Sequence, residues 1–315
     1  MPRILVIGAG AIGSALAADL ALAGADVTLV TRGARLAWLA AHPLELERGG
    51  EVLRVPVAAS AWSGIAGPVD LALMCTKMAD LPGALVPLGQ RLAGEGIVVT
   101  VQNGVEAPDL AARSLAHGAI VAGRVHGFFE MAGHRVRHVG VAPSVEFGCV
   151  RGGAAPVERR LEQILARTGF APIRAADIVR SLWLKLVLSA SLGGVALAMD
   201  VPAGSVCRTP EGQALLRRAM DEVRLVARHH GVTIDESDLA RIQAFVRAFP
   251  DDATTSLQRD VNAGAPSEHD AITGAIVRLA AAKGVAVPVF TGIARCIEAR
   301  IAQAGGPDAR ETAAS

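Results

Sequence analysis

A glycine-rich turn close to the start of the sequence constrains the fold more than any other feature. The stretch "RILVIGAGAIGSALAADL" begins with a short apolar run, Ile4–Ile7, which is typical of a strand buried on both faces. Three glycines follow directly, and an apolar helix of about Ala11–Ala23 is predicted next. In a strand–turn–helix unit of this spacing, Gly8 makes the turn, Gly10 lets the backbone approach a pyrophosphate, and Gly13 lets helix and strand pack closely.

The helix that follows the turn supplies the second half of a phosphate site. The N–H groups of its first residues have no partner inside the helix, and the positive end of the helix dipole lies at the same place. Glycines at this spacing also occur in plain tight turns, but the flanking strand and helix favour a dinucleotide site. The motif therefore predicts cofactor contacts from Gly8, Gly10, Ala11, Ile12 and Gly13.

The order of predicted elements divides the chain of 315 residues into two domains. The first half alternates apolar strands with helices, which predicts an α/β, Rossmann-type, doubly wound parallel sheet. From residue 177 onward strand signals nearly vanish and helical periodicity takes over, which predicts an all-α C-terminal domain. We therefore expect a nucleotide-binding domain over 1–176 and a helical substrate and catalytic domain over 177–315.

The predicted strands are short and apolar, and the predicted helices repeat apolar residues every three or four positions. After the first strand, the predicted strands are Val27–Val30, Val52–Val57, Val69–Cys75, Ile97–Val101 and Ile120–Val125, with edge strands Val145–Gly148 and Pro172–Arg174. The predicted helices of the second domain are Ile178–Met199, Pro210–His230, Glu236–Phe249, Ala265–Lys283 and Pro288–Ala304. The last residues, Gly305–Ser315, are expected to fray.

Composition and charge argue against several classes of function. The net charge is +1, so the sequence carries no basic footprint for nucleic acid or for a membrane surface. Aromatic residues make up 3% and Tyr is absent, which argues against a stacking platform for single strands. The four cysteines form no CxxC pair, which predicts free thiols in the cytoplasm and no metal site. The apolar stretch Leu186–Met199 is too short to cross a bilayer, so we expect a buried helix there.

The end of the second strand, Val27–Val30, indicates which dinucleotide binds. Chains that bind NAD usually carry an acid at this point, which accepts hydrogen bonds from the ribose. Here Arg32 and Arg35 follow the strand, while Asp26 lies at its opposite end. An arginine fork suits a 2′-phosphate, so the pattern favours NADP (NADPH), although Arg32 alone is also compatible with a solvated loop charge.

Three polar features of the sequence are candidates for a catalytic site. In "SLWLKLVLSASLGG", Lys185 is a lone charge in an apolar helix, where it either snorkels to water or acts in catalysis. The stretch "TTSLQRDVNAGAPSEHDAITG" gathers Ser256 and Glu268 with other polar residues, which either cap the next helix or form a site. In "VTVQNGV", Asn103 begins an ordinary turn pair, but the carboxyl end of a parallel strand is also where such sheets place ligands.

Together these motifs resemble the ketopantoate reductases (2-dehydropantoate 2-reductases), and the resemblance covers nearly the whole chain. It rests on "IGAGAIG", "TRG", "CTK", "QNGV", "LWLKL" and "SLQRDVNAGAPSEHDAITG". It implies that Asn103 and Ser256 contact the substrate and that Arg32 and Lys77 contact the cofactor phosphates. Asn103 and Glu268 are also implied to border the cofactor.

The chain departs from the family pattern at three positions near these sites. The family has asparagines four and eight residues after its catalytic lysine, where this chain has Ser189 and Gly193. Ser189 keeps one hydroxyl for the substrate, and Gly193 is expected to leave open space, so we expect a wider and less polar pocket. Asp80 replaces the glutamine that the family usually has three residues after the lysine of the "CTK" motif.

The resemblance implies NADPH-dependent reduction of a 2-oxo acid to a 2-hydroxy acid. The first candidate is ketopantoate reduction to pantoate, in pantothenate and coenzyme A biosynthesis. A lysine in an apolar helix has a lowered pKa, so Lys185 can donate a proton to the alkoxide that develops during hydride transfer. Glu268 is expected to hold Lys185 and to help order the nicotinamide or the substrate hydroxyl.

Other functions remain compatible with the same sequence. A related reductase could act on a bulkier 2-oxo acid, a 3-hydroxy acid or an imine, and a non-catalytic NADP(H)-binding module could report redox state. Retention of both Lys185 and Glu268 favours an enzyme, because a sensor needs neither. The only partner that the motifs imply is a small 2-oxo acid, and a homodimer is compatible with the sequence.

Overall fold

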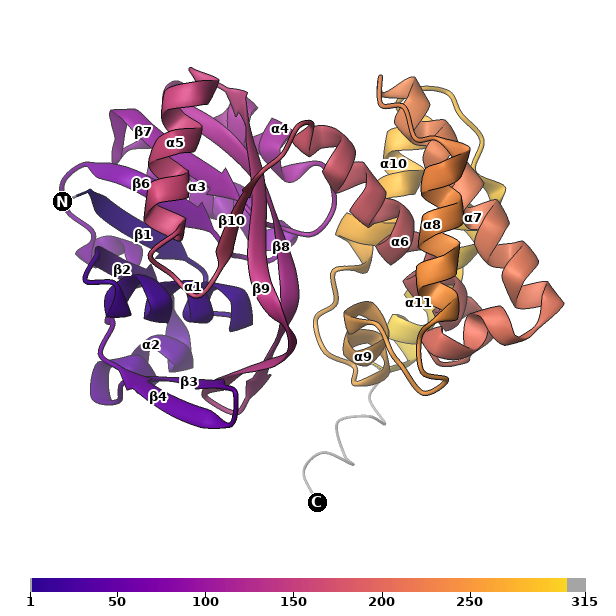
Figure 1. Ribbon diagram of the computed structural model, residues 1–315, viewed down its shortest axis with the longest axis horizontal. Helices are drawn as coiled ribbons and strands as arrows, with labels where there is room; N and C mark the ends of the chain where they lie inside the picture. The colour runs from indigo at the N-terminus through magenta and orange to yellow at the C-terminus, as the bar shows by residue number, and fades with distance from the viewer. Residues whose placement is uncertain (1, 305–315) are drawn as a thin grey trace. The chain divides into compact units, whose positions relative to one another are not determined.

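The computed structural model describes residues 2–304, and the chain divides into two compact units (Figure 1). The first unit comprises 1–102 and 106–178, and the second combines 103–105 with the chain from 179 onward. Three residues from the first half of the sequence thus belong to the helical unit. The segment Gly305–Ser315, for which fraying is expected, lies outside the described residues.

A mixed sheet of ten strands forms the first unit. Its strands are β1 Arg3–Ile7, β2 Asp26–Val30, β3 Leu44–Arg48, β4 Glu51–Val55, β5 Ala58–Ser60, β6 Val69–Met74, β7 Leu92–Thr100, β8 Ala119–Ala132, β9 Arg135–Arg151 and β10 Ala171–Arg174. The strand order is β4-β3-β9-β8-β7-β6-β1-β2-β5, with β10 also beside β9. β6, β1 and β2 are parallel neighbours, so their carboxyl ends meet at one edge of the sheet.

Alternating side chains of the central strands supply two separate cores, one on each face of the sheet. Ile4 and Val6 of β1 belong to one core, and Leu5 and Ile7 belong to the other. The first core includes helices α1 Ala11–Leu22 and α5 Ala154–Leu165, with Leu39 of α2 Gly33–Ala41; the second includes α3 Leu81–Gly89 and α4 Ala107–Ser114. This arrangement confirms the doubly wound α/β class predicted from the continuous apolar runs.

The sheet differs from a purely parallel one at two antiparallel pairs, β3 with β4 and β8 with β9. The predicted strands Ile120–Val125 and Val145–Gly148 are the apolar parts of β8 and β9, which continue as a long hairpin closed at Gly133, where φ is +62°. The outer part of this hairpin is largely exposed and therefore lacks a continuous apolar run. β3 was not among the predicted strands: its leucines alternate with glutamates, as in a half-buried strand, and it lacks the continuous apolar run on which the other predictions rested.

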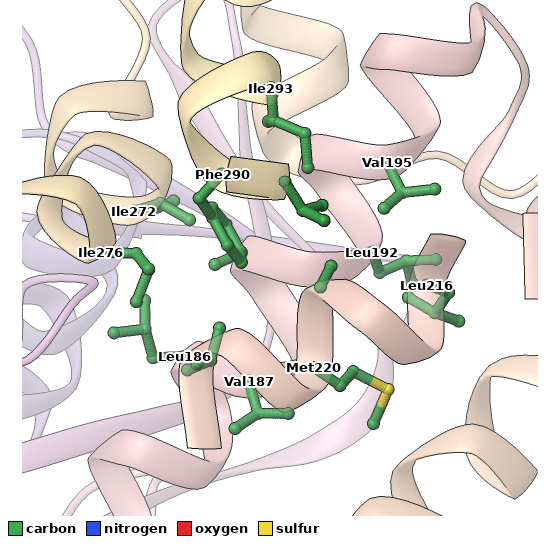
Figure 2. Close-up of a cluster of buried hydrophobic side chains, with 14 of the residues drawn as sticks. Leu186, Val187, Leu192, Val195, Leu216, Met220, Ile272, Ile276, Phe290 and Ile293 are labelled. Carbon is green, nitrogen blue, oxygen red and sulfur yellow. The ribbon is translucent and has the colours of Figure 1, made fainter. Parts of the chain in front are cut away.

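The second unit is built around a central apolar helix. Its longer helices are α6 Ile178–Met199, α7 Pro210–His229, α8 Glu236–Arg247, α9 Ser256–Asn262, α10 Ala275–Ala281 and α11 Pro288–Ala304, with short turns η3 Ala203–Arg208 and η4 Asp270–Gly274. Figure 2 shows Leu186, Val187, Leu192 and Val195 of α6 among buried side chains from α7, η4, α10 and α11. The remaining short turns of the first unit are η1 Trp62–Gly64 and η2 Met78–Asp80.

Two predictions for this unit need correction. The helix predicted at Ala265–Lys283 starts instead at the π-helical turn η4, and α9 was not predicted. α6 has 22 residues, so by length and composition alone it is able to span a membrane. The prediction that its apolar part is too short to do so was therefore wrong. In its most apolar segment, 67% of the helix is buried inside the protein, so α6 is a core helix, as expected.

Candidate active site

The glycine turn between β1 and α1 separates structural glycines from an open one. Gly8 has a φ of +109°, and an added Cβ there would lie 2.7 Å from the carbonyl carbon of Cys75. A Cβ on Gly13 would lie 1.9 Å from the carbonyl oxygen of Gly8, so the helix packs directly on the turn. Gly10 is exposed at the N-cap of α1, and no atom of the described residues lies within 4 Å of its Cβ position. The turn therefore combines close packing with one backbone position that a ligand can reach.

Cys75 supports this turn as a packing residue. Its Cβ would lie 2.9 Å from a Cβ at residue 13, and its backbone N–H donates to the carbonyl of Ile7 at 2.8 Å. Burial raises the pKa of the Cys75 thiol to about 12, so the sulfur is neutral at physiological pH. A neutral sulfur beneath the turn is suited to packing rather than to nucleophilic chemistry.

We expect alanine to lower stability at the packed glycine, Gly13, and to weaken dinucleotide binding at the exposed glycine, Gly10. Gly13→Ala should destabilise the fold by about 1–3 kcal/mol, because its methyl group has no room. Gly10→Ala should change stability by less than about 1 kcal/mol but weaken dinucleotide binding, since its methyl group enters the open position. Thermal unfolding and a fluorescence titration with NADPH measure the two effects. Parental NADPH affinity in Gly10→Ala would contradict a pyrophosphate at this turn.

The carboxyl ends of β2 and β6 place charged groups on the same edge as the glycine turn. Arg32 follows β2 with its side chain 86% exposed, and its guanidinium lies 2.9 Å from Oδ1 of Asp80, which follows β6. Lys77 is exposed at the start of η2, also after β6. This edge thus carries Arg32 and Lys77, the two residues that the resemblance assigns to cofactor phosphates.

Arg35 is placed differently from Arg32. It donates hydrogen bonds to the backbone carbonyl of His134 and to Oγ of Ser14, and its guanidinium lies 5.2 Å from the ring centre of Trp38. Burial lowers the pKa of Arg35. Arg35 therefore ties α2 to α1 and to the β8–β9 turn, which leaves Arg32 as the accessible arginine after β2.

Gln102 is a buried side chain at this sheet edge that the sequence did not single out. Its Nε2 donates to the backbone carbonyls of Met74, at 2.9 Å, and of Thr76, at 3.2 Å, which ties the end of β7 to the end of β6. Gln102 is 6% exposed, and its Oε1 has no hydrogen-bond partner among residues 2–304. A buried acceptor without a donor is costly, and a ligand hydroxyl or amide at the carboxyl edge would satisfy it.

The next residue, Asn103, lies in the helical unit and contacts Glu268. Asn103 Nδ2 donates a hydrogen bond of 2.9 Å to Oε2 of Glu268, although the two residues are 165 positions apart. Both side chains are half-buried. Gly104 has a φ of +92°, and its Cβ position lies 2.5 Å from the carbonyl oxygen of Ala271 in η4. Only glycine lets the chain follow this path, which brings Asn103 to Glu268.

Glu268 lies two residues before the π-helical turn η4, whose N-cap is His269. π-turns are rare and occur often at functional sites, because they displace side chains from the regular helical register. Here the turn carries Ala271, whose carbonyl faces Gly104. The "QNGV" and "SEHDAITG" motifs therefore contact each other within the helical unit.

The face of α6 that carries Lys185 and Ser189 is covered further along by α9. Both side chains are half-buried, and Gly193 follows on the same face. A Cβ on Gly193 would lie 3.3 Å from Thr255 Oγ1 and 3.3 Å from Leu257 Cδ2, so α9 occupies the expected open space. The expectation of a wider pocket at Gly193 was wrong, because the missing side chain admits α9 instead.

α9 begins beside Gly193 and carries Ser256 as its first helical residue. Its N-cap Thr255 and Gln258 form a capping box, in which each side chain bonds the backbone N–H of the other. Ser256 is exposed. The helical unit thus contains Lys185, Ser189, Ser256, Asn103 and Glu268, whereas the first unit contains the glycine turn with Arg32 and Lys77.

A glycine turn at the carboxyl edge of a doubly wound parallel sheet is typical of Rossmann-type proteins that bind dinucleotides. The family model for "Ketopantoate reductase PanE/ApbA" matches residues 4–152, and the model for the C-terminal part of the same family matches residues 177–301. The chain therefore belongs to the ketopantoate reductase family, whose members are oxidoreductases that act on CH–OH groups.

Individual relatives agree with this assignment. A 2-dehydropantoate 2-reductase of Mycobacterium tuberculosis is 31% identical over 300 residues, which cover 91% of this chain and 93% of that protein. The crystal structure of a ketopantoate reductase from Ralstonia eutropha has a TM-score of 0.84 at 29% identity, covering 96% of this chain and 99% of that one. A D-mandelate dehydrogenase, solved with NADH and anilino(oxo)acetate, shares the fold with a TM-score of 0.87 at 21% identity over 96% of this chain and 99% of that one.

Proposed function

We propose that the protein reduces a 2-oxo acid to the 2-hydroxy acid with NADPH in the cytoplasm, and that 2-dehydropantoate is its substrate. The observation that carries this proposal is the Asn103–Glu268 hydrogen bond, which joins two motifs of the family in one polar site. The same unit holds Lys185 on α6. A site of this composition offers a cation, a carboxylate and an amide to a substrate that carries a carboxylate and a carbonyl.

Three features of the first unit support a dinucleotide as cofactor. Gly10 is exposed, the N-terminus of α1 offers backbone N–H groups, and Oε1 of Gln102 is a buried acceptor without a donor among residues 2–304. Arg32 is exposed and carries the fork that suits a 2′-phosphate, which supports NADPH. When bound, the cofactor supplies a hydride to the carbonyl carbon of the substrate.

The side chains of the helical unit would perform the remaining chemistry. Lys185 would donate a hydrogen bond and then a proton to the carbonyl oxygen, where negative charge develops. Glu268 would hold the lysine and the nicotinamide end in place, and Asn103 would orient Glu268. Ser256 and Ser189 would supply hydroxyl groups to the polar end of the substrate.

We also propose that the protein forms a homodimer. Sedimentation of the purified protein measures its oligomeric state.

The test of this function is NADPH consumption, followed by absorbance, with a panel of 2-oxo acids. The panel contains 2-dehydropantoate, 2-oxoisovalerate and larger branched analogues, and it separates the proposed substrate from bulkier ones. We expect the highest kcat/KM with 2-dehydropantoate. Binding of NADPH without turnover on any member would contradict the proposed reaction, and faster turnover of a bulkier acid would replace the proposed substrate.

Replacing Arg32 by alanine should weaken NADPH binding by about 1–3 kcal/mol and leave NADH binding nearly unchanged. The variant removes a charged hydrogen bond to the 2′-phosphate, which NADH lacks. Stability should stay the same, because Arg32 is 86% exposed. Fluorescence titration of both nucleotides provides the measurement, and equal losses for both would place the 2′-phosphate elsewhere.

A further inference from the structure

The ion pair between Arg32 and Asp80 joins two chain segments that are 48 residues apart. The planar guanidinium of Arg32 donates one N–H to Oδ1 of Asp80 at 2.9 Å. The two side chains are 86% and 53% exposed, so the pair contributes little to fold stability. The pair therefore matters for the binding of a ligand to Arg32 rather than for stability.

Asp80 does not serve the usual purpose of an aspartate at its position. It is the N-cap residue of α3, where an aspartate normally accepts a hydrogen bond from the backbone of the first helical turn. Within the described part of the chain its side chain makes no such bond with α3, and its carboxylate lies against Arg32 instead. The structure thus directs this carboxylate toward the end of β2.

The end of β2 is where chains that bind NAD place an acid for the ribose hydroxyls. The sequence carries no acid there, since Asp26 lies at the opposite end of β2, paired in register with Arg3 of β1. Asp80 reaches this place through space, from the end of β6, which is separated from β2 only by β1. Arg32 and a carboxylate therefore share one subsite, which has a group for a 2′-phosphate and a group for a 2′-hydroxyl.

We propose that Asp80 sets the cofactor preference of this chain by weakening NADPH binding at Arg32 and accepting a hydrogen bond from the 2′-hydroxyl of NADH. This assignment rests on the proposed function, because it places the adenine ribose of the cofactor beside Arg32. A 2′-phosphate carries a charge of about −1.5 to −2 at pH 7, so it is repelled by the carboxylate and competes with it for the guanidinium. NADH carries no phosphate there and meets neither cost. The chain therefore accepts NADH as well as NADPH, with a smaller preference than Arg32 alone would produce.

The decisive variant is Asp80→Asn, which keeps the size of the side chain and removes its charge. We expect NADPH to bind about 3- to 10-fold more tightly in this variant and NADH to bind no more tightly than in the parent. The gain for NADPH should shrink between 0.05 M and 0.5 M salt, because exposed charges are screened. The dissociation constants of both nucleotides come from titrations of nicotinamide fluorescence, which do not require turnover.

The matched control is Asp26→Asn, which removes an exposed aspartate from the other end of β2. It should leave the affinities of both nucleotides unchanged, and thermal unfolding should show that both variants fold like the parent. Weaker or unchanged NADPH binding in Asp80→Asn would overturn the assignment, since Asp80 would then orient Arg32 for the phosphate or have no role. Equal gains for both nucleotides would also overturn it. If the parent binds neither nucleotide, the proposed function fails, and the role of Asp80 fails with it.

Discussion

Replacing Lys185 by alanine should lower turnover about 10²–10⁴-fold and leave dinucleotide binding unchanged. Lys185 lies on α6, the central helix of the helical unit, and its side chain is half-buried. An ammonium at this position can stabilise the oxygen that gains negative charge in hydride transfer. The glycine turn and Arg32 belong to the other unit and keep their geometry in the variant.

The measurement combines single-turnover rates with a nucleotide titration, and the chain offers a matched control. It contains three lysines, Lys77, Lys185 and Lys283. Lys283 is exposed after the last residue of α10, so Lys283→Ala should keep the parental rate and affinity. If Lys185→Ala retains more than half of the parental rate, Lys185 is a snorkelling lysine with no part in the reaction.

The parts of the fold that were predictable from the sequence are those specified by local patterns. The bounds of α6 and α11 agree with the prediction, because each is a long periodic segment with a clear start or stop. The turn at Gly8, Gly10 and Gly13 has the expected backbone, since a strand and a helix at this spacing leave few alternatives. Short elements without a continuous apolar run, such as β3 and α9, were missed for the opposite reason.

The parts of the site that escaped prediction depend on contacts between distant segments. The Asn103–Glu268 hydrogen bond crosses 165 residues, and the Arg32–Asp80 pair depends on the order of β6, β1 and β2 in the sheet. The sequence showed that Asp80 departs from the family pattern. It did not show an acid beside Arg32, because Asp80 is 48 residues away along the chain and follows β6 instead of β2. Gly193 likewise shows only a missing side chain in the sequence, whereas the packing shows that α9 fills its place.

The Asn103–Glu268 pair should behave as one functional unit when its members are removed singly and together. Each of Asn103→Ala and Glu268→Ala should lower kcat/KM about 10- to 150-fold, which corresponds to the loss of a hydrogen bond to a charged group. The double variant should lose little more than the more damaging single one, because either change already separates the amide from the carboxylate. We expect a coupling energy of about 1.4–3 kcal/mol from this cycle, which is the smaller of the two single losses. Losses that add to within about 0.5 kcal/mol would mean that the two side chains act independently.

Gly104→Ala provides a test of the same pair that leaves both side chains in place. Alanine at this position must adopt a φ of +92° and would bring its Cβ within 2.5 Å of the carbonyl oxygen of Ala271. The strain should move Asn103 away from Glu268, so kcat/KM should fall toward the value of Asn103→Ala. The control is Gly292→Ala in α11, where no atom of residues 2–304 lies within 4 Å of the Cβ position, and it should keep parental activity. A Gly104→Ala enzyme that folds and turns over like the parent would show that catalysis does not depend on where this turn holds Asn103.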